Sequence, residues 1–279
     1  MIALGRRRSQ SLARILVWGS ALATLSVLFL VIAHILTEGL PHVSASFLLG
    51  SPQRMGREGG IFPTIVGTVA LTVVAILIAT PLGVGTAIYL TEYTREGRLT
   101  RLIRFGTESL AGVPSIIFGL FGFVFFVITL GMGWSILSGG LTLAAMILPT
   151  IIRTSEEAIR SVPQVYRDVS FSLGATRWQT VTRSVLPSAL PGVATGIILG
   201  IGRSVGETAA VILTAGSALR VPTSLFSPTR TMAVHFYILA REGISLEMAY
   251  ATGAVLILAV LVVNVLANEA LRRIAARSR

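Results

Sequence analysis

The chain has 279 residues, of which 53% are hydrophobic and 13% are charged, and its formal net charge is +11. Because soluble domains carry about 25% charged residues, this composition excludes a soluble protein and predicts an all-α, polytopic membrane protein. Cysteine and lysine are both absent, which excludes disulfides and thiolate chemistry and excludes ATP binding through a P-loop, whose lysine must reach the nucleotide phosphates.

Six apolar runs predict six transmembrane helices. A helix needs about 20 apolar residues to cross the hydrocarbon core of a bilayer, and such runs occur at 15–36, 61–90, 110–130, 132–152, 187–215 and 249–266. The first run is longer than the apolar core of a signal peptide and has no well-placed cleavage site, so we interpret it as a retained anchor. The expected boundaries are an N-terminal segment (1–14), a first transmembrane helix (15–36), a loop (37–60), a transmembrane domain (61–268) with a polar loop inside it (153–187), and a tail (269–279).

The arginines indicate how these segments are oriented. They cluster before the first run and after the second, fourth and sixth runs, whereas the intervening loops carry fewer. By the positive-inside rule, the arginine-rich side faces the cytoplasm. With an even number of spans, both termini are then cytoplasmic. The positive charge therefore predicts membrane orientation rather than nucleic-acid binding.

Proline and glycine interrupt the second and third runs. Pro81, Gly83 and Gly85 lie inside the second run, and Gly112 with Pro114 opens the third. Proline removes a helix hydrogen bond, and membrane helices tolerate this where protein or a water-filled cavity satisfies the freed backbone groups. We interpret these positions as kinks beside a pathway. Simple packing is the alternative, because both residue types are frequent in membrane helices.

The polar loop at 153–187 has the pattern of two short helices. Ser161 and Gln164 have the spacing of a capping box. The apolar residues that follow recur at helical spacing along one face: Val162, Tyr166, Val169 and Leu173. Gly174 ends this first helix, because glycine adopts the left-handed conformation without steric cost.

A second helix follows the glycine. Thr176 and Gln179 form a second possible capping box, and the helix that it begins is expected to end near Pro187. The pattern alone leaves two interpretations open. The two helices either lie on lipid headgroups as an amphipathic hairpin or form a docking element for a soluble partner.

Two opposite charges, Arg203 and Glu207, lie four residues apart in the fifth run. A charged side chain in the middle of a bilayer costs about 2.5–3.5 kcal/mol on insertion scales, so such a residue usually faces a water-filled path or a partner. Gly192, Gly196 and Gly200 form a row of small residues on nearly the same face, which favours close packing against another helix. We therefore predict that the two charges face the protein interior. The alternative is an i,i+4 ion pair that only holds helices together.

The segment from Asp168 to Pro187, DVSFSLGATRWQTVTRSVLP, resembles the EAA loop of ABC importer permeases. Asp168 stands at the acidic position of that pattern, Gly174 at its glycine, and Leu186 with Pro187 at its end.

Three residues depart from the pattern. Val169 and Ser170 replace paired alanines, and Ser184 replaces a branched apolar residue. Further segments resemble the permeases of phosphate importers, and among them the PstA type: GGIFPTIVGTVALT (59–72), PLGVGTAIYLTEY (81–93), GVPSIIFGLFGF (112–123) and GRSVGETAAVILTAG (202–216).

This resemblance implies the MetI-like fold of type I ABC importer permeases, in the bacterial plasma membrane. It implies an importer with a C-type phosphate permease beside this chain, two ATP-binding subunits and an external phosphate-binding protein. ATP and Mg²⁺ would be used by the partner ATPase, and this chain would bind no cofactor. The residues that would receive the ATPase are Asp168, Val169, Ser170, Gly174, Leu186 and Pro187.

The resemblance also implies that Arg203 and Glu207 lie on the phosphate path. A guanidinium is always charged, and its planar donors match phosphate oxygens. Our hypothesis is that Glu207 neutralises Arg203 at rest and that phosphate displaces it transiently, so that binding stays weak enough for release.

Several alternatives stay open. Within the importer class these are a permease for another oxyanion and the C-type phosphate subunit. An ion-driven secondary transporter would also have buried charges, but it needs no patterned cytoplasmic hairpin, and no duplicated half is visible. An intramembrane hydrolase would need a base near Ser204, and the histidines lie near or beyond the ends of the runs. Arg220 is either an external docking residue or, as we favour, a surface residue.

Overall fold

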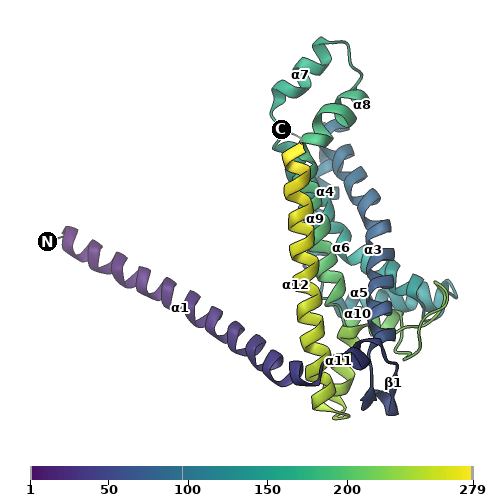
Figure 1. Ribbon diagram of the computed structural model, residues 1–279. Helices are drawn as coiled ribbons and strands as arrows, with labels where there is room; N and C mark the ends of the chain where they lie inside the picture. Colours follow the sequence, from purple (N-terminus) through teal and green to yellow (C-terminus); the bar gives the residue numbers. More distant parts are fainter. Residues whose placement is uncertain (1, 96, 278–279) are drawn as a thin grey trace.

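The computed structural model describes residues 2–95 and 97–277, which are helical apart from loops and one small β-hairpin (Figure 1). Strands β1 (Pro52–Gln53) and β2 (Glu58–Gly59) pair antiparallel. The α-helices are α1 (Ile2–Gly39), α2 (Ala45–Leu49), α3 (Phe62–Ile88), α4 (Arg98–Ala111), α5 (Ser115–Gly122), α6 (Ile136–Arg160), α7 (Gln164–Ser172), α8 (Arg177–Thr180), α9 (Leu186–Val205), α10 (Ala209–Thr214), α11 (Met232–Arg241) and α12 (Leu246–Arg277). The other elements are the 3-10 turns η1 (Leu40–His42) and η2 (Arg54–Gly56) and the π-helical segments η3 (Tyr89–Tyr93), η4 (Phe123–Thr129) and η5 (Val181–Val185).

Five helical segments of the described chain are long and apolar enough to cross a membrane: Ala13–His42, Phe62–Tyr93, Ile136–Arg160, Arg177–Val205 and Leu246–Glu269. A sixth span results if α4 and the following helix through α5 and η4 are taken together, because they are separated only by a bend of 102°. The prediction of an all-α membrane protein is confirmed, and the six predicted spans correspond to these five segments plus the bent pair.

The break in the third span lies where the sequence places it. Helix α5 begins at Ser115, inside the predicted 110–130 run, and Pro114 immediately precedes its first turn. Proline disfavours the helical conformation in the residue before it, so α4 cannot continue straight into α5. Around Pro81, by contrast, α3 stays helical from Phe62 to Ile88.

The fifth span differs from the predicted run at both ends. It begins at Arg177 and passes through α8, η5 and α9 to Val205. Pro187 lies in the first turn of α9, where proline is best tolerated, so the expectation that a helix ends near Pro187 is wrong. After Val205 the chain turns at Gly206, and α10 forms a separate short helix.

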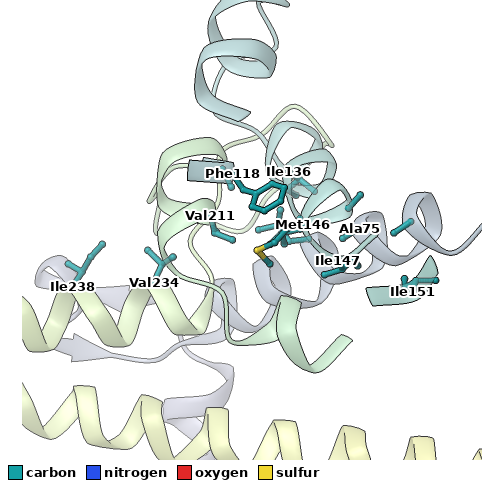
Figure 2. Close-up of a cluster of buried hydrophobic side chains, with 14 residues drawn as sticks. Ala75, Phe118, Ile136, Met146, Ile147, Ile151, Val211, Val234 and Ile238 are labelled. Atoms are coloured by element: carbon teal, nitrogen blue, oxygen red, sulfur yellow. The ribbon is translucent and has the colours of Figure 1, made fainter. Parts of the chain in front are cut away.

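The centre of the bundle is built by α3 and α6, with α9 packed against both (Figure 1). A cluster of buried apolar side chains from α3, α5, α6, α10 and α11 fills this centre (Figure 2). Its members include Ala75, Phe118, Met146, Val211 and Val234. Because lipid tails are as apolar as these side chains, such a bundle is held together by close packing rather than by burial from water.

Figure 1 also shows which elements share an end of the bundle. Helices α7 and α8 and the C-terminal end of α12 lie at one end, and α11 and the β-hairpin lie at the other. Helix α1 contacts the bundle near its own C-terminal end, where the rings of His34 and Tyr250 meet edge to face at 5.3 Å. Its remaining described length extends away from the other helices and exposes its apolar side chains.

Candidate functional site

Arg203 and Glu207 lie on either side of the end of α9. Arg203 belongs to its last turn, whereas Glu207 follows Gly206, outside the helix. Both residues are half-buried. Within the described residues, no ion pair joins the two side chains, so the structure shows neither the alternative of an i,i+4 ion pair nor the resting contact of Glu207 with Arg203. The cause is the turn at Gly206, which takes Glu207 off the helical path.

The carboxylate of Glu207 is bound to the backbone instead. Its Oε1 accepts hydrogen bonds from the backbone N–H groups of Thr208 and Ala210, both at 3.2 Å. The first N–H groups of a helix have no partner inside the helix, and α10 begins at Ala209. Glu207 therefore stabilises the start of α10 and, with it, the break between α9 and α10.

Arg203 lacks such a partner. Within residues 2–95 and 97–277, its guanidinium makes no hydrogen bond or ion pair. The adjacent hydroxyl of Ser204 is buried and also has no hydrogen-bond partner in that part of the chain. Withdrawing a charged or polar group from water is costly unless it is paired, so these two groups are suited to an anion that brings its own acceptor oxygens.

The glycine row of α9 packs against α6, as the sequence predicts. A Cβ atom on Gly192 would lie 2.5 Å from the Cβ of Ala158, and one on Gly196 would lie 1.9 Å from Oγ1 of Thr154. At Gly200 the nearest atom would be 3.5 Å away, an ordinary contact. The row thus brings the two helices into close contact along the approach to Arg203.

Helix α10 is held against α5 by glycines of the segment GVPSIIFGLFGF. A Cβ atom on Gly119 would lie 2.8 Å from Cα of Ala210, and one on Gly122 would lie 2.9 Å from Cγ2 of Thr214. From the sequence alone, this segment shows only a resemblance to phosphate permeases. Its packing role depends on which helices meet, and a single sequence does not show this.

The α7–α8 hairpin, residues 164–180, is the second functional region. The capping box of Thr176 and Gln179 is present, with both of its hydrogen bonds formed, and Gly174 has the expected left-handed backbone, with φ of +78°. The predicted capping box of Ser161 and Gln164 is absent. The Ser161 hydroxyl donates to the carbonyl of Ala158 at the end of α6, and α7 begins after Pro163.

The predicted coupling residues divide into two groups. Asp168, Val169 and Gly174 are exposed on the hairpin, and Ser170 is half-buried. Leu186 and Pro187 belong instead to the first turn of α9. Large apolar side chains are also exposed on the hairpin: Val165, Tyr166, Val169, Phe171, Leu173 and Trp178. Val162, which was expected on the same face, is buried.

Among the polar contacts that the sequence does not predict, two are of interest here. The first joins Arg167 of α7 to Glu92 of η3 at 2.6 Å, and no local motif indicates it because the two residues are 75 positions apart. The second lies at the β-hairpin end, outside the candidate spans. There the buried Arg230 donates to the carbonyl of Ser217 at 2.9 Å and to Nδ1 of His235 at 3.3 Å.

The environment of His235 keeps its imidazole neutral. Its pKa is lowered from 6.5 to about 4, chiefly because burial disfavours the charged ring and secondly because Arg230 repels a second positive charge. His235 therefore accepts the hydrogen bond from Arg230. Among the residues considered as external, Arg220 is exposed on the surface.

Comparison with known proteins gives a consistent assignment. The model of the family described as the binding-protein-dependent transport system inner membrane component matches residues 79–279. A probable ABC transporter permease protein of Bacillus subtilis, YqgI, is 33% identical over 85% of this chain and 86% of its own length. The phosphate transport system permease protein PstA of Pasteurella multocida is 32% identical over 84% of each chain.

A solved structure shares the fold. An inward-facing structure of the MetNI methionine ABC transporter matches 77% of this chain and 95% of its own chain, with a TM-score of 0.66 and 19% identity. At that identity the likeness establishes the fold alone, which is the MetI-like fold that was expected.

Proposed function

The chain belongs to the binding-protein-dependent transport system inner membrane component family, and we propose that it is the membrane permease subunit of an ATP-driven phosphate importer. The observation that carries the proposal is Arg203, a half-buried arginine at a break between two helices that has no partner in the described chain. Similarity over 84% of both chains to a phosphate permease supports phosphate as the substrate.

The path residues take different roles in this proposal. Arg203 contacts the oxyanion, because its planar donors fit tetrahedral oxygens and its charge does not depend on pH. Ser204 adds a hydroxyl beside it. Glu207 does not need to be displaced from Arg203, since its carboxylate already binds the start of α10. Through these hydrogen bonds Glu207 maintains the break between α9 and α10 beside Arg203.

The other subunits supply the energy and the substrate. This chain forms half of the pathway beside a C-type phosphate permease. Two ATP-binding subunits use ATP and Mg²⁺, and this chain itself binds no cofactor. An external phosphate-binding protein delivers phosphate. The α7–α8 hairpin is the docking element for the ATPase, since its exposed apolar side chains would otherwise face water at the arginine-rich side. Both termini are then cytoplasmic in a bacterial plasma membrane.

Phosphate uptake into vesicles that contain all four protein types tests this function. Arg203→Ala should abolish ATP-dependent uptake. Arg203→Lys should retain only part of the wild-type uptake, because lysine lacks the planar guanidinium donors. Co-purification of the other subunits shows that the complex still assembles. Uptake at the wild-type rate by an assembled Arg203→Ala complex would remove Arg203 from the path. Competition by sulfate at equal concentration would instead favour a general oxyanion permease.

A further inference from the structure

Arg167 and Glu92 form an unusually complete contact at the base of the α7–α8 hairpin. Nε of Arg167 lies 3.1 Å and 3.2 Å from the two carboxylate oxygens of Glu92, and Nη2 lies 2.6 Å from Oε1. The same guanidinium donates to the carbonyls of Val162 at 2.9 Å and Ile159 at 3.1 Å. One side chain of α7 is thus fixed to η3 and to the C-terminal end of α6.

The second arm of the hairpin, α8, also contacts the end of η3. Arg177, the first residue of α8, donates to the backbone carbonyl of Glu92 at 3.3 Å, and its guanidinium lies over the ring of Tyr93 at 5.8 Å. Both arms of the hairpin therefore contact Glu92, and the second arm also contacts Tyr93. These residues form the last turn of the π-helical segment that continues α3.

This ion pair is more buried than the neighbouring pair of Arg104 and Glu156, whose side chains are 22% and 12% exposed, and far more buried than the exposed pair in α6. The side chains of Arg167 and Glu92 are 11% and 9% exposed, whereas those of Arg153 and Glu157 in α6 are 65% and 67% exposed. A buried ion pair seldom adds stability over apolar residues of the same size, but it does fix one geometry. An arginine that engages a carboxylate and two carbonyls leaves little freedom of rotation between α7 and the helices beneath it.

The position of this contact suggests what the fixed geometry is for. Helix α3 packs along α6 and also contacts α9, and α9 ends at the break beside Arg203. A displacement of α7 would therefore act on the ends of α3 and α6, and packed helices can carry such a movement as rigid elements toward the break.

We propose that Arg167 and Glu92 are positioning residues that join the α7–α8 hairpin rigidly to α3 and α6, so that ATPase movement reaches the phosphate path. This inference rests on the proposed function, in which the hairpin receives the ATPase. It adds a specific joint that is needed for coupling but not for docking, because neither side chain lies on the exposed face of the hairpin.

The experiment compares Glu92→Gln and Arg167→Lys with a matched control, Glu157→Gln, which removes an exposed ion pair from α6. In the complete complex in vesicles, the first two variants should bind the ATPase subunits and keep basal ATP hydrolysis. Their rate of ATP hydrolysis in the presence of the phosphate-loaded binding protein should be about tenfold lower than that of wild type. A change of this size is within the range found for substitutions in coupling networks. Glu157→Gln should behave as wild type.

A covalent replacement separates coupling from folding. The chain has no cysteine, so an Arg167→Cys/Glu92→Cys double variant can be joined by a short bifunctional maleimide. The unlinked double variant should be uncoupled, and the linked one should regain stimulated hydrolysis and uptake. Normal coupling in Glu92→Gln, or no recovery after cross-linking, overturns the proposal. Loss of ATPase binding in Glu92→Gln would also overturn it, because the contact would then only maintain the fold. If the wild-type complex takes up no phosphate, the proposed function itself fails.

Discussion

Glu207 has a different partner from the one that its spacing from Arg203 predicts. A glutamate four residues after an arginine predicts an ion pair on a helix, but this requires the helix to continue. Here the helix ends at Val205, and the carboxylate binds the N–H groups of Thr208 and Ala210. The chemistry of Glu207 is thus that of a helix N-terminus, where a negative charge is favourable.

We expect Glu207→Gln and Glu207→Ala to differ. Glutamine keeps a side-chain oxygen that can accept from Thr208 and Ala210, so its thermal midpoint and phosphate uptake should stay close to wild type. Alanine leaves those N–H groups without an acceptor, which typically costs about 1 kcal/mol at a helix start, and it should lower both. The measurements are thermal unfolding in detergent and uptake in vesicles. Equal loss of uptake in both variants would mean that the negative charge, rather than the hydrogen bonds, is required.

His235 makes the β-hairpin end sensitive to acid. The pKa of its imidazole is lowered to about 4 in the folded protein by burial and by Arg230, against 6.5 as the ordinary value. Between these values the unfolded chain binds more protons than the folded chain, so stability falls as the pH falls from about 6.5 to about 4 and is fully present above 6.5. The shift corresponds to roughly 3 kcal/mol. His235→Asn, which can still accept from Arg230, should flatten the dependence of the thermal midpoint on pH in this window. An unchanged slope would show that other groups cause it.

The glycine row of α9 makes a graded prediction for a whole helix. A Cβ atom on Gly196 would lie 1.9 Å from Oγ1 of Thr154, whereas one on Gly200 would have no neighbour closer than 3.5 Å. Overpacking a well-packed contact typically costs about 1–3 kcal/mol. Gly196→Ala should therefore lower the thermal midpoint clearly, and Gly200→Ala should have little effect. If Gly200→Ala is as harmful as Gly196→Ala, the contact between α9 and α6 is not the one described.

The elements that the sequence predicts well are those with a local physical cause. The break at Gly112 and Pro114 follows from proline sterics, and the capping box of Thr176 and Gln179 follows from spacing. The end of α9 at Val205 could not be predicted in this way, because apolar residues continue to Ala215 and hydropathy does not distinguish one straight helix from two. Glu92 was missed for a related reason: its partner Arg167 is 75 residues away, and only the packing of α3 beside α6 brings the two together.

The two ends of the molecule differ in their chemistry. The α7–α8 hairpin and the β-hairpin lie at opposite ends (Figure 1). The α7–α8 hairpin carries Arg167, Arg177 and exposed apolar side chains, whereas the buried pair of Arg230 and His235 lies at the β-hairpin end. In the proposed function, these ends face the ATPase and the phosphate-binding protein respectively. The functional assignment therefore requires one orientation of the whole molecule in the membrane, and the positive-inside rule favours that same orientation.

Cysteine labelling can test this orientation without background, because the natural chain has no cysteine. Ser172, at the end of α7, and Ser51, before the β-hairpin, are both exposed. In spheroplasts, a membrane-impermeant maleimide should label Ser51→Cys and not Ser172→Cys. Inside-out vesicles should give the opposite pattern once the ATPase is removed, since a docked ATPase would cover α7. Labelling of Ser172→Cys from outside would place the α7–α8 hairpin on the external side of the membrane, where no ATPase could bind it. That result would contradict the docking role of the α7–α8 hairpin and the coupling role of Arg167, while leaving the contact of α9 with α6 unaffected.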